Sequence, residues 1–222
     1  MRDRIRGLFI LIFFCAGGVM IFFSYRESRP FAEEKIRQKA VREAVVQEAE
    51  SPMDRKIDFE MLKHINEDII GWLYIPQIGV DTPILKGDTD EEYLAENFEG
   101  EYSPLGSIFT YSHTDEKLSD PHFCLFGHNM PSGQMFGRLS EFTDDEFCRM
   151  NNTYWLYTPE RTKQIVVQKV CEVEMDDAVF QDDWEGGVGE VQTVTLAACA
   201  GYGNTPLRIA VTGAVEEEKI IL

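Results

Sequence analysis

Two stretches near the C-terminus, VQTVTLAAC at residues 191–199 and LRIAV at residues 207–211, decide how this chain folds. In both stretches apolar side chains alternate with other side chains, a period of two that is typical of a β-strand with one buried face. If Leu196 points into the core, Cys199 points away from it at the end of the first strand. By the same alternation, Arg208 points away from its apolar neighbours in the second. The seven intervening residues include two glycines and a proline, which suit a turn. We therefore expect paired strands that bring Cys199 and Arg208 together off the core face.

The chain between residue 69 and these two strands repeats the pattern of short apolar runs separated by turn residues. Turn signals such as PQIG at residues 76–79 and PSG at residues 131–133 stand between the runs. Many short strands with few helices indicate a β-barrel or a β-sandwich. We expect the other strands at residues 71–75, 82–85, 107–110, 123–126, 154–157 and 165–175.

Two short helices are expected among the strands. Residues 58–68 place Phe59, Leu62 and Ile65 three positions apart on one side, as in an amphipathic helix. The sequence TDDE at residues 143–146 has the form of a capping box and predicts the start of a second helix.

The N-terminal segment differs in character from the rest of the chain. Residues 7–23 contain no charged side chain, and 17 residues is near the lower limit for a helix that crosses a membrane. Three arginines precede the run and favour a cytoplasmic N-terminus. A cleaved signal peptide is the alternative, but YRESRP at residues 25–30 makes a poor cleavage site. We predict a cytoplasmic tip and transmembrane anchor over residues 1–25.

The segment that follows is rich in Ala, Glu, Lys, Arg and Gln. Its small apolar residues recur at roughly helical spacing over residues 31–50, and the pattern ends at Ser51 and Pro52. We interpret residues 26–56 as a helical stalk that serves as a solvated spacer. The predicted catalytic domain then occupies residues 57–222.

Charge is distributed unevenly along the chain. The whole sequence holds 21 Lys and Arg against 39 Asp and Glu, and 31 of the acidic residues lie in residues 57–222. Nucleic-acid binding needs a basic patch to contact phosphates, and this acidic domain lacks one. We expect no nucleic-acid partner and interpret the acidic surface as a solubilising one.

Five cysteines leave two interpretations open. Cys15 lies in the apolar N-terminal run, and the other four, Cys124, Cys148, Cys171 and Cys199, are scattered through the predicted domain. Outside the cell they could form two disulfides, or one of them could be a free, reactive thiol. No pair has the C-x-x-C spacing of a metal site.

Three residues could carry chemistry together. A cation beside the Cys199 thiol would favour the thiolate and could bind a developing oxyanion, and Arg208 supplies that cation. In LFGHNM at residues 125–130 an apolar strand ends and His128 follows it at the start of a turn. A partly exposed imidazole there can act as a general acid or base. Taken one at a time, the three have plainer interpretations: a packed cysteine, a solvated arginine and a turn histidine.

The segments that hold these residues resemble class B sortases. FGHNM-x-x-G-x-MF at residues 126–136 is similar to the family's catalytic histidine segment, and TL-x-x-C at 195–199 with RIAV at 208–211 resembles its cysteine and arginine strands. The similarity covers about residues 57–215 in order. It includes the upstream pieces IGWL-x-I at 70–75, D-x-PI at 81–84, YL-x-x-x-F at 93–98 and GSIF at 106–109.

The resemblance implies a mainly β fold, an eight-stranded β-barrel with an N-terminal helical extension and short helices. It implies that the Cys199 thiolate attacks a backbone carbonyl, that His128 protonates the leaving amine, and that Arg208 steadies the oxyanion. It further implies substrate contacts from Asn129, Thr195, Ala198, Tyr93 and Leu94.

The resemblance also implies partners and a location. The substrates would be secreted proteins with a C-terminal sorting signal, and a peptidoglycan precursor would supply the amine that receives the acyl group. The enzyme would be held at the membrane of a Gram-positive cell by one helix, with the catalytic domain outside. No metal or cofactor is implied.

This chain departs from the family pattern at two places. Ala198 stands where the family commonly has Thr immediately before the cysteine. The stretch 176–190 is short and contains the glycine-rich sequence GGVG at 186–189, where class B enzymes typically carry a long helix-bearing insertion. The recognised peptide motif is therefore not transferred to this chain.

Other functions remain open at this level. A pilus-assembling sortase would use a lysine of another pilin as the amine. A simple cysteine protease would need only the Cys–His pair, and a catalytically idle binding module would keep the fold alone.

Overall fold

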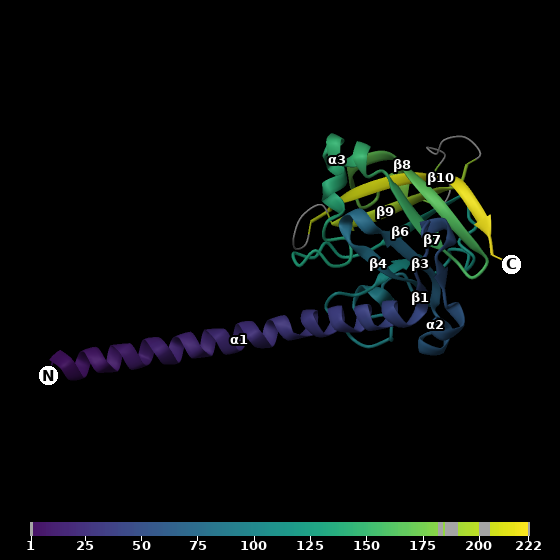
Figure 1. The fold of residues 1–222 in the computed structure, drawn as a ribbon. Helices are drawn as coiled ribbons and strands as arrows, with labels where there is room; N and C mark the ends of the chain where they lie inside the picture. Colours follow the sequence, from purple (N-terminus) through teal and green to yellow (C-terminus); the bar gives the residue numbers. More distant parts are fainter. Residues whose placement is uncertain (1, 182–183, 185–190, 200–204, 222) are drawn as a thin grey trace.

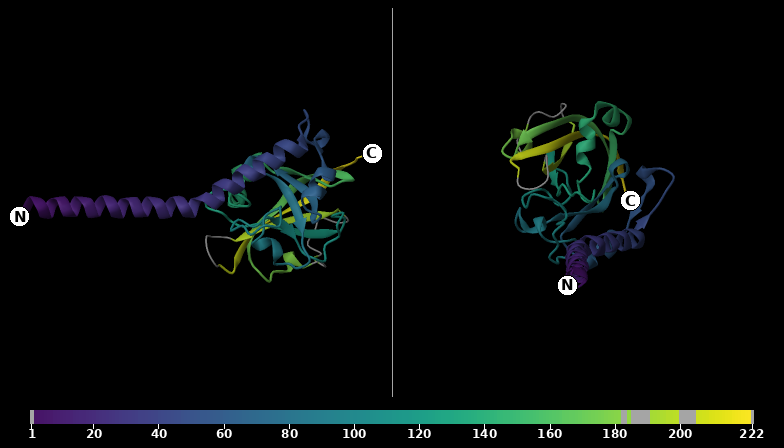
Figure 2. Two further views of the ribbon diagram at one scale, coloured as in Figure 1. Left: turned by 90° about the horizontal axis from the view of Figure 1, so that it is seen from below. Right: turned by 90° about the vertical axis from the view of Figure 1, so that its left-hand side faces the viewer.

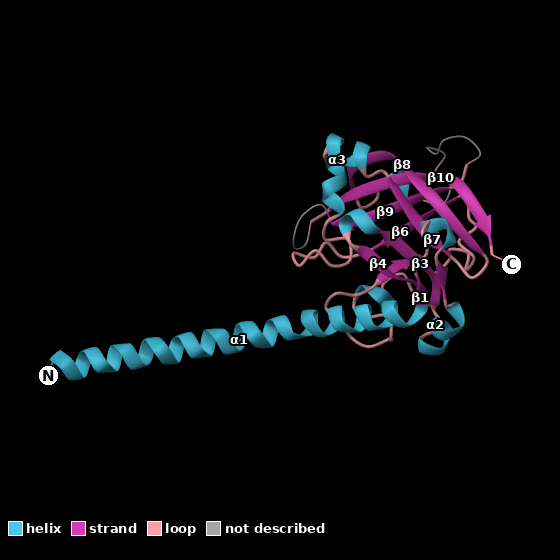
Figure 3. Cartoon of the chain, in the orientation of Figure 1, coloured by secondary structure: helices cyan, strands magenta, loops and turns pink. Residues whose placement is uncertain are grey.

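The structure is a computed structural model that describes residues 2–181, 184, 191–199 and 205–221. Within these ranges the side chains of residues 2–12, 14–15, 23–24, 27–28 and 199 are not described. Figure 1 shows a long N-terminal helix running into a barrel of strands, and Figure 3 shows that the other helical segments are short.

Eight strands close into a barrel in the order β10-β8-β7-β3-β4-β5-β6-β9. The eight strands that the sequence predicts are confirmed, with ends that differ by a few residues. Their bounds are β3 Ile69–Ile75, β4 Val80–Lys86, β5 Ile108–Thr110, β6 His122–Phe126, β7 Thr153–Tyr157, β8 Arg161–Glu174, β9 Thr193–Cys199 and β10 Leu207–Ile220.

Most neighbouring strands in the barrel are antiparallel, and two pairs are parallel. β4 pairs with β5 and β6 pairs with β9 in parallel, whereas β9 and β10 form the antiparallel pair expected from the sequence. In that pair Arg208 lies directly opposite Cys199. The parallel pairing of β6 with β9 joins segments about seventy residues apart, and it places the end of β6 beside the end of β9.

The barrel interior contains the side chains that the alternation predicted. Val194, Leu196 and Ile209 are buried in one large apolar cluster inside the barrel. The outer face of the same strands is also covered, because Ala197 and Ala210 pack against the short helix η5 (Ala178–Phe180). The off-core face is therefore solvent-free over much of its length, which the sequence did not predict.

Two short helices lie near the predicted positions. α2 (Phe59–Ile65) begins after Asp58, and α3 (Asp145–Met150) follows η4 (Leu139–Thr143). The capping box predicted to start at Thr143 is wrong by one residue, because the Asp144 side chain accepts the hydrogen bond from Phe147 N at 2.7 Å. The remaining 3₁₀ turns are η1 (Pro52–Asp54), η2 (Pro76–Ile78) and η3 (Glu92–Leu94).

The long helix α1 spans Arg2–Val45 and continues into the small strand β1 (Val46–Gln47), which pairs with β2 (Lys56–Ile57). Figure 2 shows α1 bending where it reaches the barrel, and Pro30 lies inside the helix. Val41 and Val45 are 6% and 3% exposed and pack against the barrel's outer apolar cluster. The interpretation of this segment as a solvated spacer is therefore wrong for its last turns.

A buried ionic network fixes α1 to the barrel. The Arg55 guanidinium is almost fully buried, contacts Asp81 at 2.6 Å and lies 4.1 Å from the Tyr74 ring centroid. Asp81 also accepts hydrogen bonds from Arg42 of α1 and from the Trp72 indole at 2.7 Å. One carboxylate thus joins α1, the β1–β2 connection and the barrel wall.

None of the helices in the described residues is long and apolar enough to cross a membrane.

Two of the four cysteines in the barrel domain, Cys148 and Cys171, are free thiols, and two disulfides would need all four. The interpretation with two disulfides is therefore wrong.

Candidate active site

The ends of β9 and β10 bring two predicted catalytic residues together. Cys199 is the last residue of β9 and Arg208 is the second residue of β10, and they face each other in register. The side chain of Cys199 lies outside the described residues. Ala198, its neighbour, faces the barrel interior and is 3% exposed.

The guanidinium of Arg208 is held by backbone carbonyls. Its Nη1 donates to the oxygens of Thr205 at 2.6 Å and Leu207 at 3.1 Å, and its Nη2 lies 3.6 Å from Met175 Sδ. Among the described residues Arg208 has no carboxylate partner within ion-pair distance. The positive charge is therefore oriented by neutral groups and remains available to an anion.

His128 lies at the same end of the barrel. Phe126 pairs with Ala197 of β9, and Gly127 N donates to the Ala197 oxygen at 3.2 Å, so the pairing continues past the end of β6. His128 follows one residue later, beside the end of β9. The three predicted catalytic residues thus lie at one rim of the barrel, Cys199 and Arg208 at facing positions of β9 and β10 and His128 just beyond the end of the adjacent β6.

A backbone carbonyl orients the His128 imidazole. Nε2 of His128 lies 2.7 Å from the Leu94 oxygen. Because a carbonyl only accepts hydrogen bonds, Nε2 carries the hydrogen, and the lone pair of the neutral ring lies on Nδ1.

The turn that presents the Leu94 carbonyl is built from buried groups. The Tyr93 hydroxyl donates to Asp68 at 2.6 Å and accepts from Asn66 at 3.0 Å. Burial and the bond to Asp68 raise the pKa of Tyr93, so the phenol stays protonated as a donor. Gly106 closes the turn at φ +57°, with Ser107 N donating to the Tyr93 oxygen at 2.9 Å.

The five predicted substrate contacts fall into two groups. Leu94 is 41% exposed, and Asn129 is partly exposed and forms a β-bridge with Met135 beside His128. Thr195, Ala198 and Tyr93 are buried, and the Thr195 hydroxyl is 2.8 Å from that of Thr212. The side chains of these three residues therefore offer a substrate almost no surface, and a contact would have to use their backbone.

Three groups around the catalytic residues were missed by the sequence analysis. The carbonyls of Leu94 and Thr205 act through backbone atoms, which leave no trace in residue identity. Met175, 61% exposed, touches the arginine from beyond the end of β8. The GSIF motif that contains Gly106 was the one available signal for the turn that orients His128.

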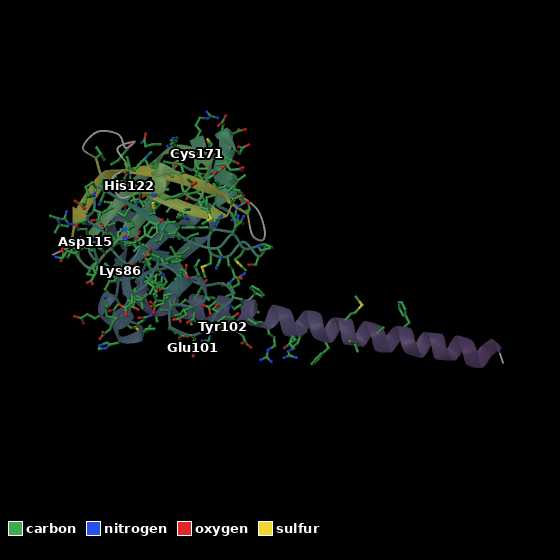
Figure 4. The ribbon with its side chains drawn as sticks, turned by 180° about the vertical axis from the view of Figure 1, so that it is seen from behind. Lys86, Glu101, Tyr102, Asp115, His122 and Cys171 are labelled. Carbon is green, nitrogen blue, oxygen red and sulfur yellow. The ribbon has the colours of Figure 1, made fainter. Side chains whose placement is uncertain are left out.

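A second Cys–His pair lies elsewhere on the barrel. Cys124 Sγ is 3.7 Å from His122 Nε2, but both residues are buried, and the two ring nitrogens of His122 lie 2.9 Å from Thr193 Oγ1 and the Val179 oxygen. Figure 4 shows His122 on the side of the barrel away from α1. This pair is closed to a peptide and serves packing. His122 is the first residue of β6.

Across the part of the chain that the structure describes, no group of three or more His, Cys, Asp or Glu residues is arranged to hold a metal ion.

Comparison with known sequences gives consistent relatives. A family model described as Sortase domain matches residues 73–216. Sortase B of Listeria monocytogenes is 30% identical over 144 residues, which cover 62% of this chain and 58% of that protein. Sortase B of Staphylococcus aureus is 29% identical over 172 residues, which cover 75% and 70% of the two chains. The chain thus spans less than two thirds of the length of the Listeria relative.

Solved structures share the fold. A Staphylococcus aureus sortase B–substrate complex has a TM-score of 0.66 at 24% identity, over 72% of this chain and 84% of that chain. Sortase B from Bacillus anthracis in complex with AAEK1 has a TM-score of 0.67 at 25% identity, over 87% and 98%.

Proposed function

The chain belongs to the sortase family, and on that premise we propose that it is a cysteine transpeptidase of the class B type. The proposal rests on the position of Cys199, Arg208 and His128 at one barrel rim. Cys199 and Arg208 face each other on β9 and β10, and His128 follows the end of β6. Strand ends hold side chains more rigidly than free loops do, and transpeptidation requires a nucleophile, an acid–base group and an oxyanion contact in fixed relation.

The reaction would proceed in two steps. Nδ1 of His128 takes the proton of the Cys199 thiol, the thiolate sulfur forms a bond to the scissile carbonyl carbon, and the guanidinium of Arg208 binds the oxygen as it becomes negative. The C–N bond breaks, and the leaving amine takes the proton from Nδ1 of His128, which leaves a thioester. An incoming amine then attacks the thioester carbon and gives its proton to Nδ1, and Cys199 departs as thiolate. The acyl group thus ends on the incoming amine, and the proton that His128 gave to the leaving amine is replaced by the proton of the incoming amine.

The substrate would be a peptide segment of a secreted protein, and the acceptor an amine of the cell wall. A Streptococcus pyogenes class B sortase involved in pilus biogenesis has the same fold, with a TM-score of 0.64 at 24% identity. That likeness keeps a second acceptor, a lysine of a protein subunit, as the alternative.

An extended peptide would lie along the exposed rim and would not enter the barrel. Exposed Leu94 and the bridge Asn129–Met135 flank His128, whereas the barrel interior behind Ala198 is filled. The peptide would therefore cross the rim between the η3 turn and the start of β10.

We further propose that residues 7–23 anchor the chain in a membrane. The support is their uncharged sequence and the arrangement of the molecule. Figure 1 shows β10 running from the barrel end that faces the N-terminal half of α1 to the end where the chain terminates. Since Arg208 is at the beginning of β10, the reactive rim would face the membrane side.

The test of the reaction is intact mass spectrometry of the purified chain with a library of donor peptides, with and without an added amine. We expect an acyl adduct on the wild type, its transfer to the amine, and neither event in Cys199→Ala, while Cys124→Ala behaves as wild type. Hydrolysis that the amine does not divert would indicate a protease, and absence of any adduct would indicate a binding module. A lysine-containing protein fragment as acceptor separates the pilus alternative from the cell-wall one.

The anchor has its own test. Membrane fractions of cells that express the full chain should retain it after alkaline carbonate washing, and a chain lacking residues 1–25 should be released. Release of both would overturn the anchor.

A further inference from the structure

A cleft of about 430 Å³ lies between α1 and the barrel. One wall is a face of α1, the second is the turn into β4, and the third is the loop that follows β6. Four basic side chains line it: Lys35, Lys39 and Arg42 from α1, and Arg138 from the loop.

This concentration of positive charge is unusual for the molecule. Residues 57–222 hold only 10 of the 21 basic residues against 31 acidic ones. Lys35, Lys39 and Arg42 follow one another at i, i+4 and i+7, which puts them on a single face of the helix. Arg138 meets them from the opposite wall. Cations from two walls therefore border the same cleft in a chain that is acidic as a whole.

The two lysines retain most of their charge for a ligand. Lys35 makes no ion pair with any described residue. Lys39 lies 3.6 Å from Glu43, but both side chains are largely exposed, and such a pair contributes little and breaks readily.

The two arginines are held in place by pairs that leave donors unused. Arg138 binds Glu141 through Nε at 2.6 Å and Nη2 at 2.9 Å. Arg42 binds Asp81 through Nε and Glu48 through Nη2. Within the described residues, Nη1 of both guanidinium groups has no partner.

The one carboxylate of the cleft is already satisfied. Asp81 lines the cleft, but it accepts bonds from Arg42, from Arg55 at 2.6 Å and from the Trp72 indole at 2.7 Å. The negative charge of Asp81 is therefore paired with the two arginines of the network that fixes α1, and it does not neutralise Lys35 or Lys39.

We propose that this cleft binds a phosphate or pyrophosphate ester. Several converging cations and free guanidinium donors suit a compact polyanion with many acceptor oxygens better than a single carboxylate. Lys35 is ten residues beyond Tyr25, about 15 Å along a helix, so the ester could belong to a lipid headgroup or to a free phosphate compound. The proposal goes beyond the transpeptidase function and does not depend on it.

The cleft is connected to the catalytic histidine. The loop that carries Arg138 begins at His128, where Phe136 N donates to the His128 oxygen at 3.0 Å and Asn129 forms a bridge with Met135. An anion held by the loop would therefore stiffen the backbone on which His128 stands.

Calorimetric titration of the full chain with inorganic pyrophosphate, at fixed ionic strength, tests the site. We expect saturable binding that weakens by about tenfold or more in the double variant Lys35→Gln/Lys39→Gln, because each lost charge-assisted bond weakens the complex substantially. The matched control is Lys56→Gln/Lys169→Gln, which removes the same charge from two other exposed lysines. Thermal melting confirms that both variants are folded.

Three results would overturn the site: no saturable binding, equal weakening in both double variants, or sulfate binding as tightly as pyrophosphate. The same titration with dihexanoyl phosphatidylglycerol identifies the source. Tighter binding of this short-chain lipid than of pyrophosphate, lost in the cleft variant only, assigns a lipid headgroup. The reverse order assigns a phosphate compound free of the lipid.

Discussion

At the scale of single residues, Arg208 is the group whose chemistry is most directly testable. Its Nη1 donates to two carbonyl oxygens, those of Thr205 and Leu207, and these two hydrogen bonds orient the planar guanidinium. A lysine at this position keeps the charge but cannot reproduce the fork. We expect Arg208→Lys to lower turnover by about tenfold or more, measured as the rate of amine-dependent product formation.

Arg161→Lys is the control for that change. Arg161 lies at the other end of the β8–β10 pair, where it binds Glu218 at 2.7 Å. It should retain wild-type turnover. Wild-type turnover in Arg208→Lys would show that position 208 contributes charge alone.

Gly106 controls the turn that orients the imidazole. It has a φ of +57°, and a Cβ there would lie 2.6 Å from the Tyr93 oxygen and 2.7 Å from the Leu94 oxygen, which accepts from His128. Because both contacts are backbone, the carbonyl must move. We expect Gly106→Ala to lower kcat by about tenfold or more with a smaller change in KM, in steady-state assays.

Gly79→Ala separates this effect from backbone strain. Gly79 also has a positive φ, +75°, but nothing lies within 4 Å of its would-be Cβ. Both variants lose some stability, and only Gly106→Ala should lose catalysis. An equal fall of kcat in the two would argue against a role for the Leu94 carbonyl.

The residue scale also shows what sequence alone could predict. Alternation in two strands joined by a turn predicted that Arg208 and Cys199 lie near each other on the off-core face, because a period of two fixes which side chains share a face; the register that puts them directly opposite comes from the structure. It could not predict that Thr195 is buried, because the cover over that face, η5, comes from a different part of the chain.

At the scale of elements, α1 contains a group that should make its docking depend on pH. Glu34 is 4% exposed, accepts one bond from Asn97 at 3.2 Å, and has one oxygen with no partner among the described groups. Burial raises the pKa of Glu34, against the opposing effects of Asn97 and Arg37, and Glu99 and Glu101 raise it further. Figure 4 shows Glu101 on the part of the barrel next to α1.

The sign of the effect follows from the raised pKa. The folded state binds the proton of Glu34 more tightly than the unfolded chain, so the stabilisation is complete below about pH 4.5 and is lost as pH rises through the folded-state pKa. We therefore expect Glu34→Gln to raise the thermal midpoint at pH 7 and to leave it unchanged near pH 4. Glu33→Gln, one residue away with an exposed side chain, is the control. Equal shifts in both variants would reject the assignment.

Strands were easier to predict than helix ends. Eight apolar runs with turn residues between them were sufficient to place all eight barrel strands, because each run buries a face. The predicted N-cap of α3, Thr143, was one residue before the observed one, Asp144. Both residue types are good caps, and Asp144 is the cap because Thr143 is the last residue of η4.

At the scale of the whole molecule, the docked and undocked parts of α1 should contribute differently to stability. Val41 and Val45 are buried on the barrel, and Arg42 bonds to Asp81. Deleting residues 1–25 should leave the unfolding free energy and the activity on peptides unchanged. Deleting residues 1–45 should cost on the order of 3 kcal/mol, measured by urea unfolding, since it exposes the apolar surface that the two valines cover.

Comparing the two deletions shows which part of α1 stabilises the barrel. If the shorter deletion destabilises the barrel as much as the longer one, the contacts of the last turns of α1 are not what holds the helix. Loss of activity towards peptides after the shorter deletion would mean that residues 1–25 help to shape the site.

The docking of α1 and the closure of the barrel could not be predicted from local patterns. The small apolar residues of residues 31–50 suit a free helix as well as a docked one, and the deciding partner, Asp81, is about forty residues away. Closure depends on the parallel pairing of β6 with β9, which no turn between them specifies. Only the resemblance to a known family predicted a closed barrel, and with it such long-range pairing.

In the closed barrel each strand has a hydrogen-bonded neighbour on both sides over part of its length. Many peptide-binding domains hold an extended ligand by adding it to a sheet as a further strand, so that backbone hydrogen bonds provide affinity for almost any sequence. Where the barrel strands are paired on both sides this mode is closed, and an extended ligand would there be held by side chains and by the loops at the rim. Affinity and selectivity would then have the same origin, because a peptide that lacks the matching side chains loses both.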